Sequence, residues 1–496
     1  AGPGFLNFRI TTPSLEAGLM AQIGDPDRLG LPQLDQSEAK TIVIDFSAPN
    51  IAKPMGVHHL LSTIIGQAIN NLLKTCGYKV IRDNYVGDWG TQYGKLTVAI
   101  QKWGDMEKIK KNPIPELLNL YVKFHDQAEK DPGLEDQGRA AFKKLEEKDL
   151  EITKLWQWIR EISLEECQKL WARLGAEFDC INSESFYEDK MQPIIAEGLK
   201  TGVITEGQEG ALIIEMDDPN KPPAIIRKKD GATLYATRDL ARVKYWQDEL
   251  KGSLGINVVD IAQKLYFEQL FEAAHKMGFT KMQQVHIDFG RMEFPEGGMS
   301  TRKGKVILLE EVLDEAEKQA LKKIKDHSSE LPEDEQKELA RKLGLGAIKY
   351  NVLSQSRNKN YSFDWDQMLS FEGNSAPYLQ YAYTRTQSIL RKAAEAGLKT
   401  DLAVTASLAV EEKELLKKLL EFEEAIQRST EEYKPNLLCS YLFETAQAFS
   451  TFYNNLRVLD AETAESISTR LKLVEAAGTV LKKGLGLLGI EVPERM

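Results

Sequence analysis

The sequence predicts an α/β fold built on a doubly wound parallel sheet, with a helical insertion and an all-α C-terminal bundle. Thr41–Phe46 (TIVIDF) is a short β-branched run, as a buried parallel strand requires. Apolar residues then recur at helical spacing from Leu60 to Leu73, and Gly77 marks a helix stop. Tyr78–Asn84 (YKVIRDN) is the next predicted strand. A strand, a helix and a strand within about 45 residues indicate a right-handed βαβ unit.

The bulk composition is that of a soluble globular protein. The chain of 496 residues is too long for one ordinary core, so we expect several domains. It is 42% hydrophobic and 28% charged. It has no run of about 18 apolar residues, and its first residues lack the basic start and apolar core of a signal peptide. A net charge of −11 argues against indiscriminate nucleic-acid binding but is compatible with a local basic face.

The cysteines form no CxxC pair and have no zinc-ligand spacing. We expect them to be small buried hydrophobic residues in a reducing compartment, which favours the cytoplasm. They are Cys76, Cys167, Cys180 and Cys439.

Connectors, helices and short strands make up the rest of the first 371 residues. Residues 1–40, rich in Gly and Pro, are interpreted as a terminal strand followed by a connector, and residues 105–200 as a charged helical insertion between the two halves of the sheet. Asp230-Gly231 predicts a hairpin between two short runs. The further strands predicted are Ala224–Arg227, Thr233–Ala236, Val258–Ile261 and Gln284–Phe289.

Strand signals end at about Glu372, and an all-α domain is predicted beyond it. Its first helix carries Tyr381, Tyr383 and Arg385, which either stack on splayed nucleic-acid bases or belong to the helix core. The predicted helices are Ser375–Ala393, Glu411–Ser429, Pro435–Leu456 and Ser466–Lys483, the last ending at Gly484.

Gly56–His59 opens the helix that follows the first strand. A helix N-terminus beyond a parallel strand offers free N–H groups and a partial positive charge, which suits a triphosphate. His58 and His59 would add hydrogen bonds to phosphate oxygens. The alternative is a pair of helix-cap histidines on an exposed face.

Gly297–Lys305 (GGMSTRKGK) is a short loop rich in cations. A mobile loop with Arg302 and Lys303 could close over pyrophosphate and neutralise its charge, with Ser300 as a hydroxyl contact. The alternative is a solvated basic turn.

A possible guanidinium pocket lies in YATRD, which places Tyr235 and Asp239 on one face of a helix start. A guanidinium ligand needs planar acceptors, preferably a carboxylate, and often an aromatic wall. The alternative is an ordinary hairpin exit. Asp88, Trp89 and Gln92 form a further polar and aromatic cluster after a strand end, where ligands of open α/β sheets gather; a core tryptophan with a capping Asp is equally consistent with it.

TIVIDFSAPNIAKPMGVHHL and MSTRKG followed by VILLEEVLDEA resemble the two ATP-handling motifs of class I aminoacyl-tRNA synthetases. YVGDWGTQYGKL, YATRD, FEGNSAPYLQYAYTRTQSILRKA, FYNNLRVL and the terminal PERM extend the resemblance to arginyl-tRNA synthetases nearly end to end. The resemblance implies a remnant of an N-terminal tRNA-elbow domain and a connector at 1–40, a Rossmann-like catalytic domain at 41–371 and an anticodon-binding domain at 372–496.

The resemblance also implies roles for individual residues. Lys53 would compensate for Gly298, which replaces the first lysine of the general class I loop, and Glu206 or Glu209 would add a further acceptor for the substrate. No metal-binding residue is implied. The catalytic residues implied are His59, Lys53, Ser300, Arg302 and Lys303; the ATP-binding residues are Gly56, His58, His59, Met292 and Met299; the arginine-binding residues are Asn50, Tyr235, Asp239 and Gln263.

The chain departs from the family pattern in two segments. The family reads KPMHVGHL where this chain reads KPMGVHHL, so Gly56 replaces a histidine and His58 replaces a glycine. That glycine lets adenine lie against the helix backbone, and a histidine side chain there would block or shift the base. Tyr266 stands where the family often has a histidine near the nucleotide, and it could stack on a base.

The resemblance implies ligation of L-arginine to its tRNA through arginyl-adenylate, with Mg²⁺-ATP as the energy source. Its partners would be tRNA(Arg), arginine and ATP, with the protein a cytoplasmic monomer. One alternative is a synthetase-like chain that binds tRNA or arginine without activating it, which the changed histidine motif favours. A different ATP-dependent adenylyl-transferring enzyme on the same fold is the other.

Overall fold

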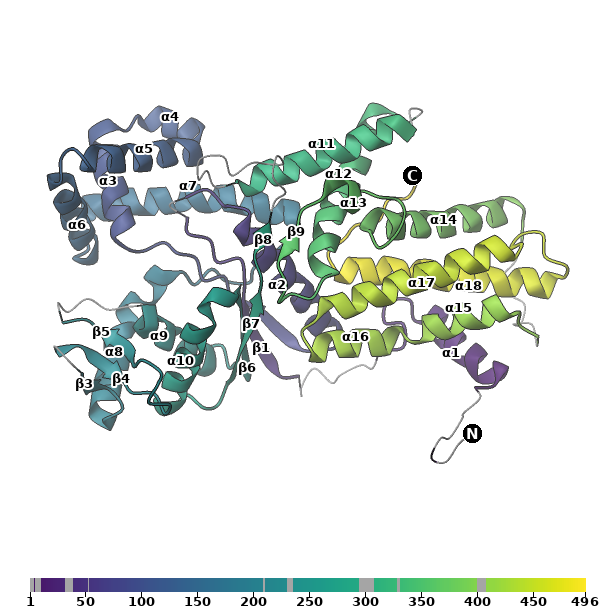
Figure 1. Cartoon of the computed structure of the whole chain (residues 1–496), viewed down its shortest axis with the longest axis horizontal. Coiled ribbons are helices and arrows are strands. Elements are labelled where there is room, and N and C mark those ends of the chain that lie inside the picture. The colour runs from purple at the N-terminus through teal and green to yellow at the C-terminus, as the bar shows by residue number, and fades with distance from the viewer. Residues whose placement is uncertain are drawn as a thin grey trace.

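The computed structural model describes residues 4, 10–31, 39–51, 53–207, 210–229, 235–293, 307–327, 331–398 and 407–496. Its central sheet has four parallel strands in the order β2-β1-β6-β7 (Figure 1). They are β1 (Thr41–Asp45), β2 (Lys79–Arg82), β6 (Leu254–Asp260) and β7 (Gln283–Phe289). The register aligns Thr41 with Lys79 on one side of β1 and Ile42 with Leu254 on the other.

Helices cover both faces of this sheet. Ile42 and Ile44 belong to the core that contains α2 (His58–Thr75), whereas Val43 belongs to a second core with α9 (Tyr235–Asp248) and α10 (Lys264–Lys276). Successive side chains of a strand point to opposite faces, so β1 is buried on both. The predicted doubly wound α/β fold is confirmed.

Between β2 and the next strands the chain is largely helical. The longest of these helices, α7 (Leu150–Leu174), begins at the Asp149 cap and ends at Gly175 in the left-handed conformation. Figure 1 shows α7 running from the other helices of this region toward the middle of the molecule. These others are α3 (Thr91–Trp103), α4 (Met106–Lys111), α5 (Pro113–Ala128), α6 (Gly133–Glu146), η1 (Glu184–Tyr187) and α8 (Glu188–Thr201).

The predicted hairpin at Asp230-Gly231 is wrong in its second strand. Ala236 lies in α9, and β5 (Ala224–Arg227) pairs instead with the preceding β4 (Leu212–Ile214), which pairs antiparallel with β3 (Thr205–Glu206). The Thr237 hydroxyl donates to the Ile226 carbonyl and ties the start of α9 to β5. Residues 230–234 lie outside the described ranges.

The connector predicted before the sheet is partly helical, because residues 12–24 form α1 (Thr12–Gly24). Residues 1–3 and 5–9 lie outside the described residues, so the terminal strand stays a prediction. Pro13 suits the first turn of a helix, and Leu15 and Leu19 are buried. The two apolar side chains, four residues apart, anchor α1 to the helical domain through the core that they share.

Within the described residues 376–398 and 407–496, five helices form the C-terminal region, whereas four were predicted. Glu411–Ser429 is interrupted at Glu421, which ends one helix and precedes the next. The last helix passes Gly484 and ends at Leu487. The five are α14 (Ala376–Glu395), α15 (Val410–Leu420), α16 (Phe422–Glu431), α17 (Pro435–Asn455) and α18 (Ala464–Leu487).

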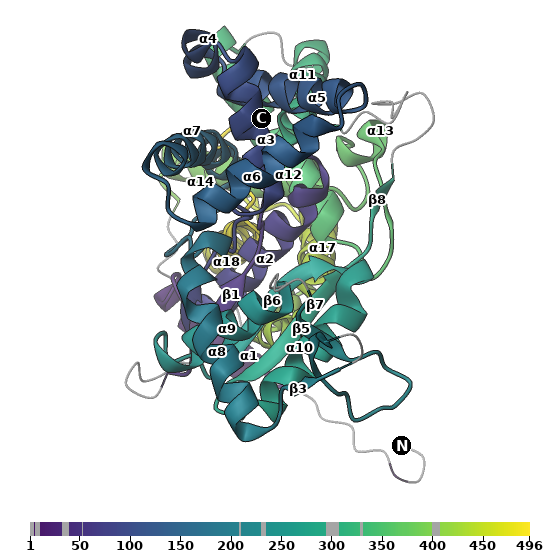
Figure 2. The same ribbon diagram turned by 90° about the vertical axis from the view of Figure 1, so that its left-hand side faces the viewer.

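One apolar core joins this helical region to α2. Leu72 of α2 and Leu481 of α18 belong to the same buried cluster, and the Asn71 side chain donates to the Leu487 carbonyl over 3.1 Å. Figure 2 shows α2, α17 and α18 close together behind the insertion helices. The remaining elements are η3 (Ile261–Gln263), β8 (Met292–Glu293), α11 (Leu309–His327), α12 (Glu333–Leu353), β9 (Tyr361–Ser362) and α13 (Trp365–Met368).

The cysteines are all free, but only Cys167 and Cys439 are buried, whereas Cys76 and Cys180 are half-buried. None of the helices within the described ranges has the length and apolar character needed to cross a membrane.

Candidate active site

The candidate site lies beyond the carboxyl ends of the parallel strands, where open α/β sheets bind ligands. From β1 the chain passes through the loop that carries Asn50 and reaches α2 at His58. β6 ends at Asp260, and η3 with Gln263 follows directly. Adjacent parallel strands thus bring the predicted histidine, Asn50 and Gln263 segments to one edge of the sheet.

The histidine motif is fastened to the chain that leaves the cation-rich loop. The Val57 N–H donates to the Ile307 carbonyl (2.9 Å), and the Leu309 N–H donates to the Met55 carbonyl (2.9 Å). Gly56 forms an antiparallel bridge with Leu308 between these bonds. The loop residues predicted to contact ATP, namely Met299, Ser300, Arg302 and Lys303, lie outside the described residues.

His58 and His59 lie close together at the start of α2. Their ring centroids are 3.9 Å apart, and His59 Nδ1 is 3.2 Å from the Gly56 carbonyl oxygen. Burial, aided by the neighbouring His58, lowers the pKa of His59 to about 3, although the hydrogen bond to the Gly56 carbonyl opposes the shift. Burial likewise lowers the pKa of His58, against the attraction of Asp260. Both rings are therefore neutral at pH 7 before an anion arrives. The one N–H of neutral His59 is the Nδ1–H that donates to the Gly56 carbonyl, so His59 must gain a second proton before its Nε2 can donate to a phosphate.

Lys53 and Met292 lie at the margins of this motif. The exposed Lys53 places its Nζ 5.2 Å from the ring centroid of Tyr121, on α5 of the insertion. Met292 begins β8, is half-buried and pairs with Tyr361.

Asp239 is a buried carboxylate on α9, one turn after Tyr235. It accepts a hydrogen bond from the Tyr266 hydroxyl, and its Oδ1 lies 3.3 Å from Arg242 Nε without an aligned hydrogen bond. Tyr235 is 65% exposed and Gln263 is also exposed, so both are open to a ligand. A buried carboxylate oxygen with an unmet hydrogen bond suits an incoming cationic donor.

The surroundings of Asp239 carry more carboxylates than guanidinium groups. Arg242 is shared between Asp239 and Asp45, whose Oδ2 accepts its Nη1 hydrogen bond over 2.7 Å. Arg242 Nη2 donates a hydrogen bond to Asn257 Oδ1 (2.9 Å). The centroid of the Tyr85 ring lies 4.5 Å from the guanidinium carbon. Burial raises the pKa of Asp45 even though Arg242 opposes it.

Glu184, in η1, is the site residue that the sequence did not single out. It is 7% exposed, and burial raises the pKa of its carboxyl to about 7 against the pull of Arg238, whose Nη1 lies 3.7 Å away. Asp88 and Asp239 add to the shift by repulsion. By contrast, Glu206 is exposed in β3, and Glu209 lies outside the described residues. Only a Glu between two serines marks position 184, and that pattern has no periodicity to reveal its burial.

A chain of polar contacts links Asn50 to Glu184. The Asn50 amide donates to Gln92 Oε1 (3.2 Å), Gln92 Nε2 is 3.4 Å from the Trp89 carbonyl oxygen, and the Trp89 N–H is 3.3 Å from Glu184 Oε2. Asp88 is fully buried and accepts from Arg160 Nε and the Ser185 N–H, both at 2.8 Å. Asp88 therefore links the segment after β2 to Arg160 of α7 and to Ser185 of η1, while Gln92 orients Asn50.

The helical domain presents an exposed aromatic and cationic group. Arg385 lies between Tyr381 and Tyr453, 4.7 and 4.9 Å from their ring centroids. Tyr381 and Tyr453 are 40% and 39% exposed, whereas Tyr383 is buried and belongs to the core.

Family models match both parts of the chain. The family described as "tRNA synthetases class I (R), catalytic domain" matches residues 27–365, and "DALR anticodon binding domain" matches residues 379–496. The arginine–tRNA ligase of Halothermothrix orenii is 43% identical over 92% of this chain and 80% of its own length. That of Clostridium perfringens is 41% identical over 100% of this chain and 87% of its own length.

Solved structures agree with the sequence relatives. The arginyl-tRNA synthetase of Plasmodium falciparum has a TM-score of 0.82 at 25% identity, covering 98% of this chain and 84% of its own. That of Thermus thermophilus has the same TM-score and identity, covering 99% and 87%. The resemblance inferred from the sequence is confirmed, and the chain belongs to the arginyl-tRNA synthetases, the arginine family of class I tRNA synthetases.

Proposed function

We propose that the chain ligates L-arginine to its tRNA at the expense of ATP, by way of arginyl-adenylate. The observations that carry the proposal are two interacting buried carboxylates, Asp239 and Glu184, and a helix N-terminus that bears two histidines. The guanidinium of arginine would pair with the carboxylates, and the triphosphate of ATP would bind at the helix N-terminus. Membership of the family and the DALR match support tRNA as the acceptor.

In the first step, an oxygen of the arginine carboxylate attacks the α-phosphorus of ATP, and the bond to the bridging oxygen of the β-phosphate breaks. Pyrophosphate leaves and arginyl-adenylate remains. His59, protonated once the triphosphate is bound, donates to the phosphates, and His58 lies on the adenine side. Lys53, Arg302 and Lys303 neutralise the departing pyrophosphate, with Ser300 as a further contact. Gly56, Met292 and Met299 would line the nucleotide.

In the second step, the 2′-hydroxyl oxygen of the terminal adenosine attacks the arginyl carbonyl carbon, and AMP leaves. Asn50 and Gln263 hold the backbone groups of arginine, while Asp239, Glu184 and Tyr235 hold its side chain. Catalysis is positioning and charge stabilisation without a protein nucleophile.

Mg²⁺ would enter with ATP as part of that substrate. Among the described residues, no group of three or more His, Cys, Asp and Glu side chains is placed to hold a metal ion. We further propose a catalytic domain at 41–371, an anticodon-binding domain at 372–496 and a monomeric protein.

Pyrophosphate exchange with arginine, ATP and tRNA(Arg) tests the proposal. We expect exchange to need arginine rather than lysine, and the charged tRNA to carry arginine at its 3′ end. Binding of tRNA and arginine without any exchange would instead establish a synthetase-like binding protein, the alternative that the changed histidine order favours.

A further inference from the structure

The loop that delivers Asn50 begins in a strained backbone conformation. Ser47 has φ 73° and Ala48 has φ 40°, two successive non-glycine residues in the left-handed region. Such a conformation is unfavourable for a residue with a β-carbon, so the surrounding structure must hold it. Ser47 and Ala48 lie between β1 and Asn50, with only Pro49 separating Ala48 from Asn50, so their conformation sets the direction in which the chain enters Asn50.

Buried polar side chains occupy the amides of this loop. The Ser47 N–H donates to Ser62 Oγ (2.9 Å), and the Ala48 N–H donates to Asn84 Oδ1 (3.0 Å). The Thr63 hydroxyl donates to Ser47 Oγ (3.0 Å). Ser62 and Thr63 belong to α2 and Asn84 follows β2, so the first βαβ unit holds the loop from two sides.

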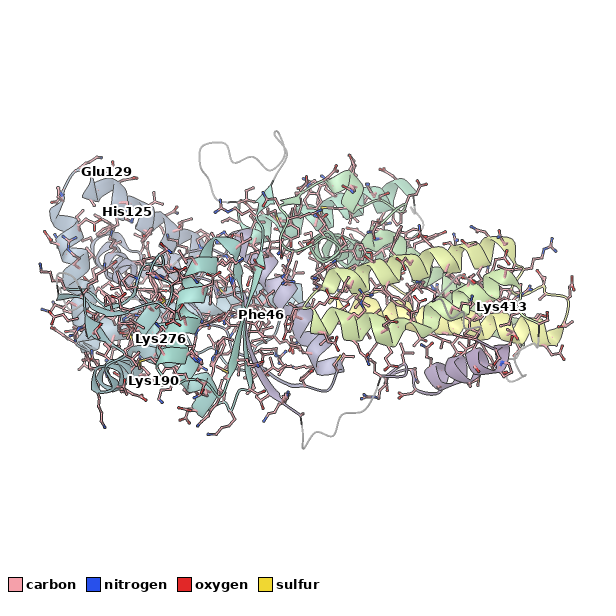
Figure 3. The ribbon with its side chains drawn as sticks, turned by 60° about the horizontal axis from the view of Figure 1, so that its bottom comes forward. Phe46, His125, Glu129, Lys190, Lys276 and Lys413 are labelled. Atoms are coloured by element: carbon pink, nitrogen blue, oxygen red, sulfur yellow. The ribbon has the colours of Figure 1, made fainter. Side chains whose placement is uncertain are left out.

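The remaining contact to Ser47 comes from the insertion. Trp171, in the last turn of α7, donates its indole N–H to Ser47 Oγ over 2.9 Å and is 3% exposed. Its ring lies 4.9 Å from that of Phe178, which in turn lies 4.7 Å from Phe46. Figure 3 labels Phe46, the residue before Ser47, near the middle of the molecule.

The same turn of α7 is fixed on its other side. Arg173 pairs with Asp314 (2.8 Å) and Glu317 (2.9 Å), both on α11. α11 begins at Leu309, whose N–H is bonded to Met55 next to the histidine motif. The end of α7 is therefore held by contacts to α11, and Trp171 is presented to Ser47 from a rigid base.

We propose that Trp171 is a positioning residue for the amino-acid site. Its indole N–H fixes the Ser47 hydroxyl, which keeps Ser47 and Ala48 left-handed and so holds Asn50 against the substrate. Trp171 touches no substrate itself; it makes the placement of Asn50 depend on the insertion. The role of Asn50 as a substrate ligand rests on the function proposed above, whereas the conformation of the loop does not.

The test compares Trp171→Phe with Trp158→Phe. Phenylalanine keeps an aromatic ring at position 171 and removes only the indole N–H and part of the ring area. Trp158 lies on the same helix and is half-buried, but it is not among the residues bonded to Ser47. Its variant therefore reports general effects on α7. Ser47→Ala removes the acceptor, and the double variant Trp171→Phe/Ser47→Ala asks whether both act through one bond.

Two measurements are read together. Hydrogen exchange of peptides that cover residues 46–51 should speed up in Trp171→Phe and in Ser47→Ala, and the double variant should add little. The KM for arginine in pyrophosphate exchange should rise about tenfold, the effect of one lost hydrogen bond, while the KM for ATP changes less than about twofold. Trp158→Phe should resemble the parent in both.

Faster loop exchange without a rise in the arginine KM would overturn the proposal, because the bond would then be purely structural. Equal rises in both KM values would also overturn it. A parent that supports no pyrophosphate exchange would refute the proposed function instead, and the exchange rates of residues 46–51 would still decide whether Trp171 holds the loop.

Discussion

The hydroxyl of Tyr266 donates a hydrogen bond to the carboxylate of Asp239. Tyr266 therefore belongs to the proposed guanidinium pocket, although its position in the sequence suggested a surface for the nucleotide base. The bond fixes one carboxylate oxygen, and the other is the one near Arg242 Nε. A neutral tyrosine orients Asp239 without competing with a cationic substrate for its charge.

Tyr266→Phe should therefore weaken arginine binding and leave ATP binding unchanged. The lost hydrogen bond is to a charged acceptor, so we expect a loss of about 1.5–3 kcal/mol in arginine affinity, measured by calorimetry. If the arginine affinity is unchanged and the KM for ATP rises, Tyr266 contacts the nucleotide and not arginine.

Selectivity for arginine over lysine should depend on Asp239. Lysine is a compact point charge and cannot reproduce a forked contact, so the parent should prefer arginine strongly. Asp239→Ala removes a buried charge partner and should cost about 3–5 kcal/mol in arginine binding. Calorimetry measures both. Asp248→Ala, on the same helix and paired with Lys244 (3.2 Å), is the matched control and should bind arginine normally. Normal binding by Asp239→Ala would remove Asp239 from the pocket.

Arginine binding should tighten as the pH rises through the pKa of Glu184, which burial places at about 7. The ionised carboxylate binds a guanidinium, so bound arginine lowers this pKa and releases a proton. Below pH 7 the arginine Kd should fall with rising pH by up to about tenfold per unit, and then level off above it.

For folding, the raised pKa of Glu184 has the opposite effect. The native state retains the proton to higher pH than the unfolded chain, so this group stabilises the native state most at low pH and loses that contribution as pH rises through about 7.

Glu184→Gln should remove the pH dependence of arginine binding and weaken it at pH 8. Calorimetry in buffers of different ionisation enthalpy counts the released proton. Retention of the full pH dependence in Glu184→Gln would assign it to another group.

The order of the histidine motif can be tested by restoring the family pattern. The double variant Gly56→His/His58→Gly removes the exposed ring at position 58 and should tighten ATP binding if that ring crowds the base. The KM for ATP in pyrophosphate exchange measures this. A much slower double variant would show instead that the arrangement of His58 beside His59 is adapted to this site.

The stacked group on the helical domain should contribute to tRNA binding. Tyr381→Ala and Arg385→Ala each remove part of a stack that is open to bases, which should cost about 1–3 kcal/mol in tRNA affinity. Filter binding or calorimetry with tRNA(Arg) measures the loss, with arginine binding as the internal reference. Tyr381→Phe keeps the ring beside Arg385 and removes only the hydroxyl that accepts a hydrogen bond from Arg385 Nη2 (2.8 Å), so it should lose less tRNA affinity than Tyr381→Ala. Deletion of the whole domain is a poorer test, because it would strip α2 of its apolar cover.

Local patterns in the sequence predicted the parallel sheet correctly, whereas the site residues stay a prediction. β-branched runs and helical periodicity located β1, α2 and β2, because a strand buried on both faces leaves an uninterrupted apolar signal. Asn50 and His59 were proposed from the resemblance, and both follow β1 at one edge of the parallel sheet. Asp239 was proposed from guanidinium chemistry as well, and it lies near the end of β1 because Arg242 contacts both Asp239 and Asp45. The sequence could not give long-range partners, such as the pairing of β5 with β4 in place of a local hairpin.

Glu184 and Tyr266 show the same limit within the site. Glu184 is identified by burial and by Arg238 and Asp239, which lie more than fifty residues away in the chain. Tyr266 has an ambiguous neighbourhood in sequence, and only its contact with Asp239 assigns it. Residue type and spacing carry no information on such contacts, because they arise from packing between elements distant in the chain.

The continuous core beneath α2 couples the proposed ATP site to the helices proposed to bind tRNA. α2 begins at the histidines, and farther along it is buried together with α17 and α18, with Asn71 bonded to the end of α18. Side chains in such a core are close-packed and transmit strain rather than absorb it. ATP at the start of α2 and tRNA on the C-terminal helices would thus contact opposite ends of one rigid unit. A small tilt of α17 and α18 on tRNA binding would therefore shift α2 and the histidine that contacts the ATP phosphates, without a loop movement.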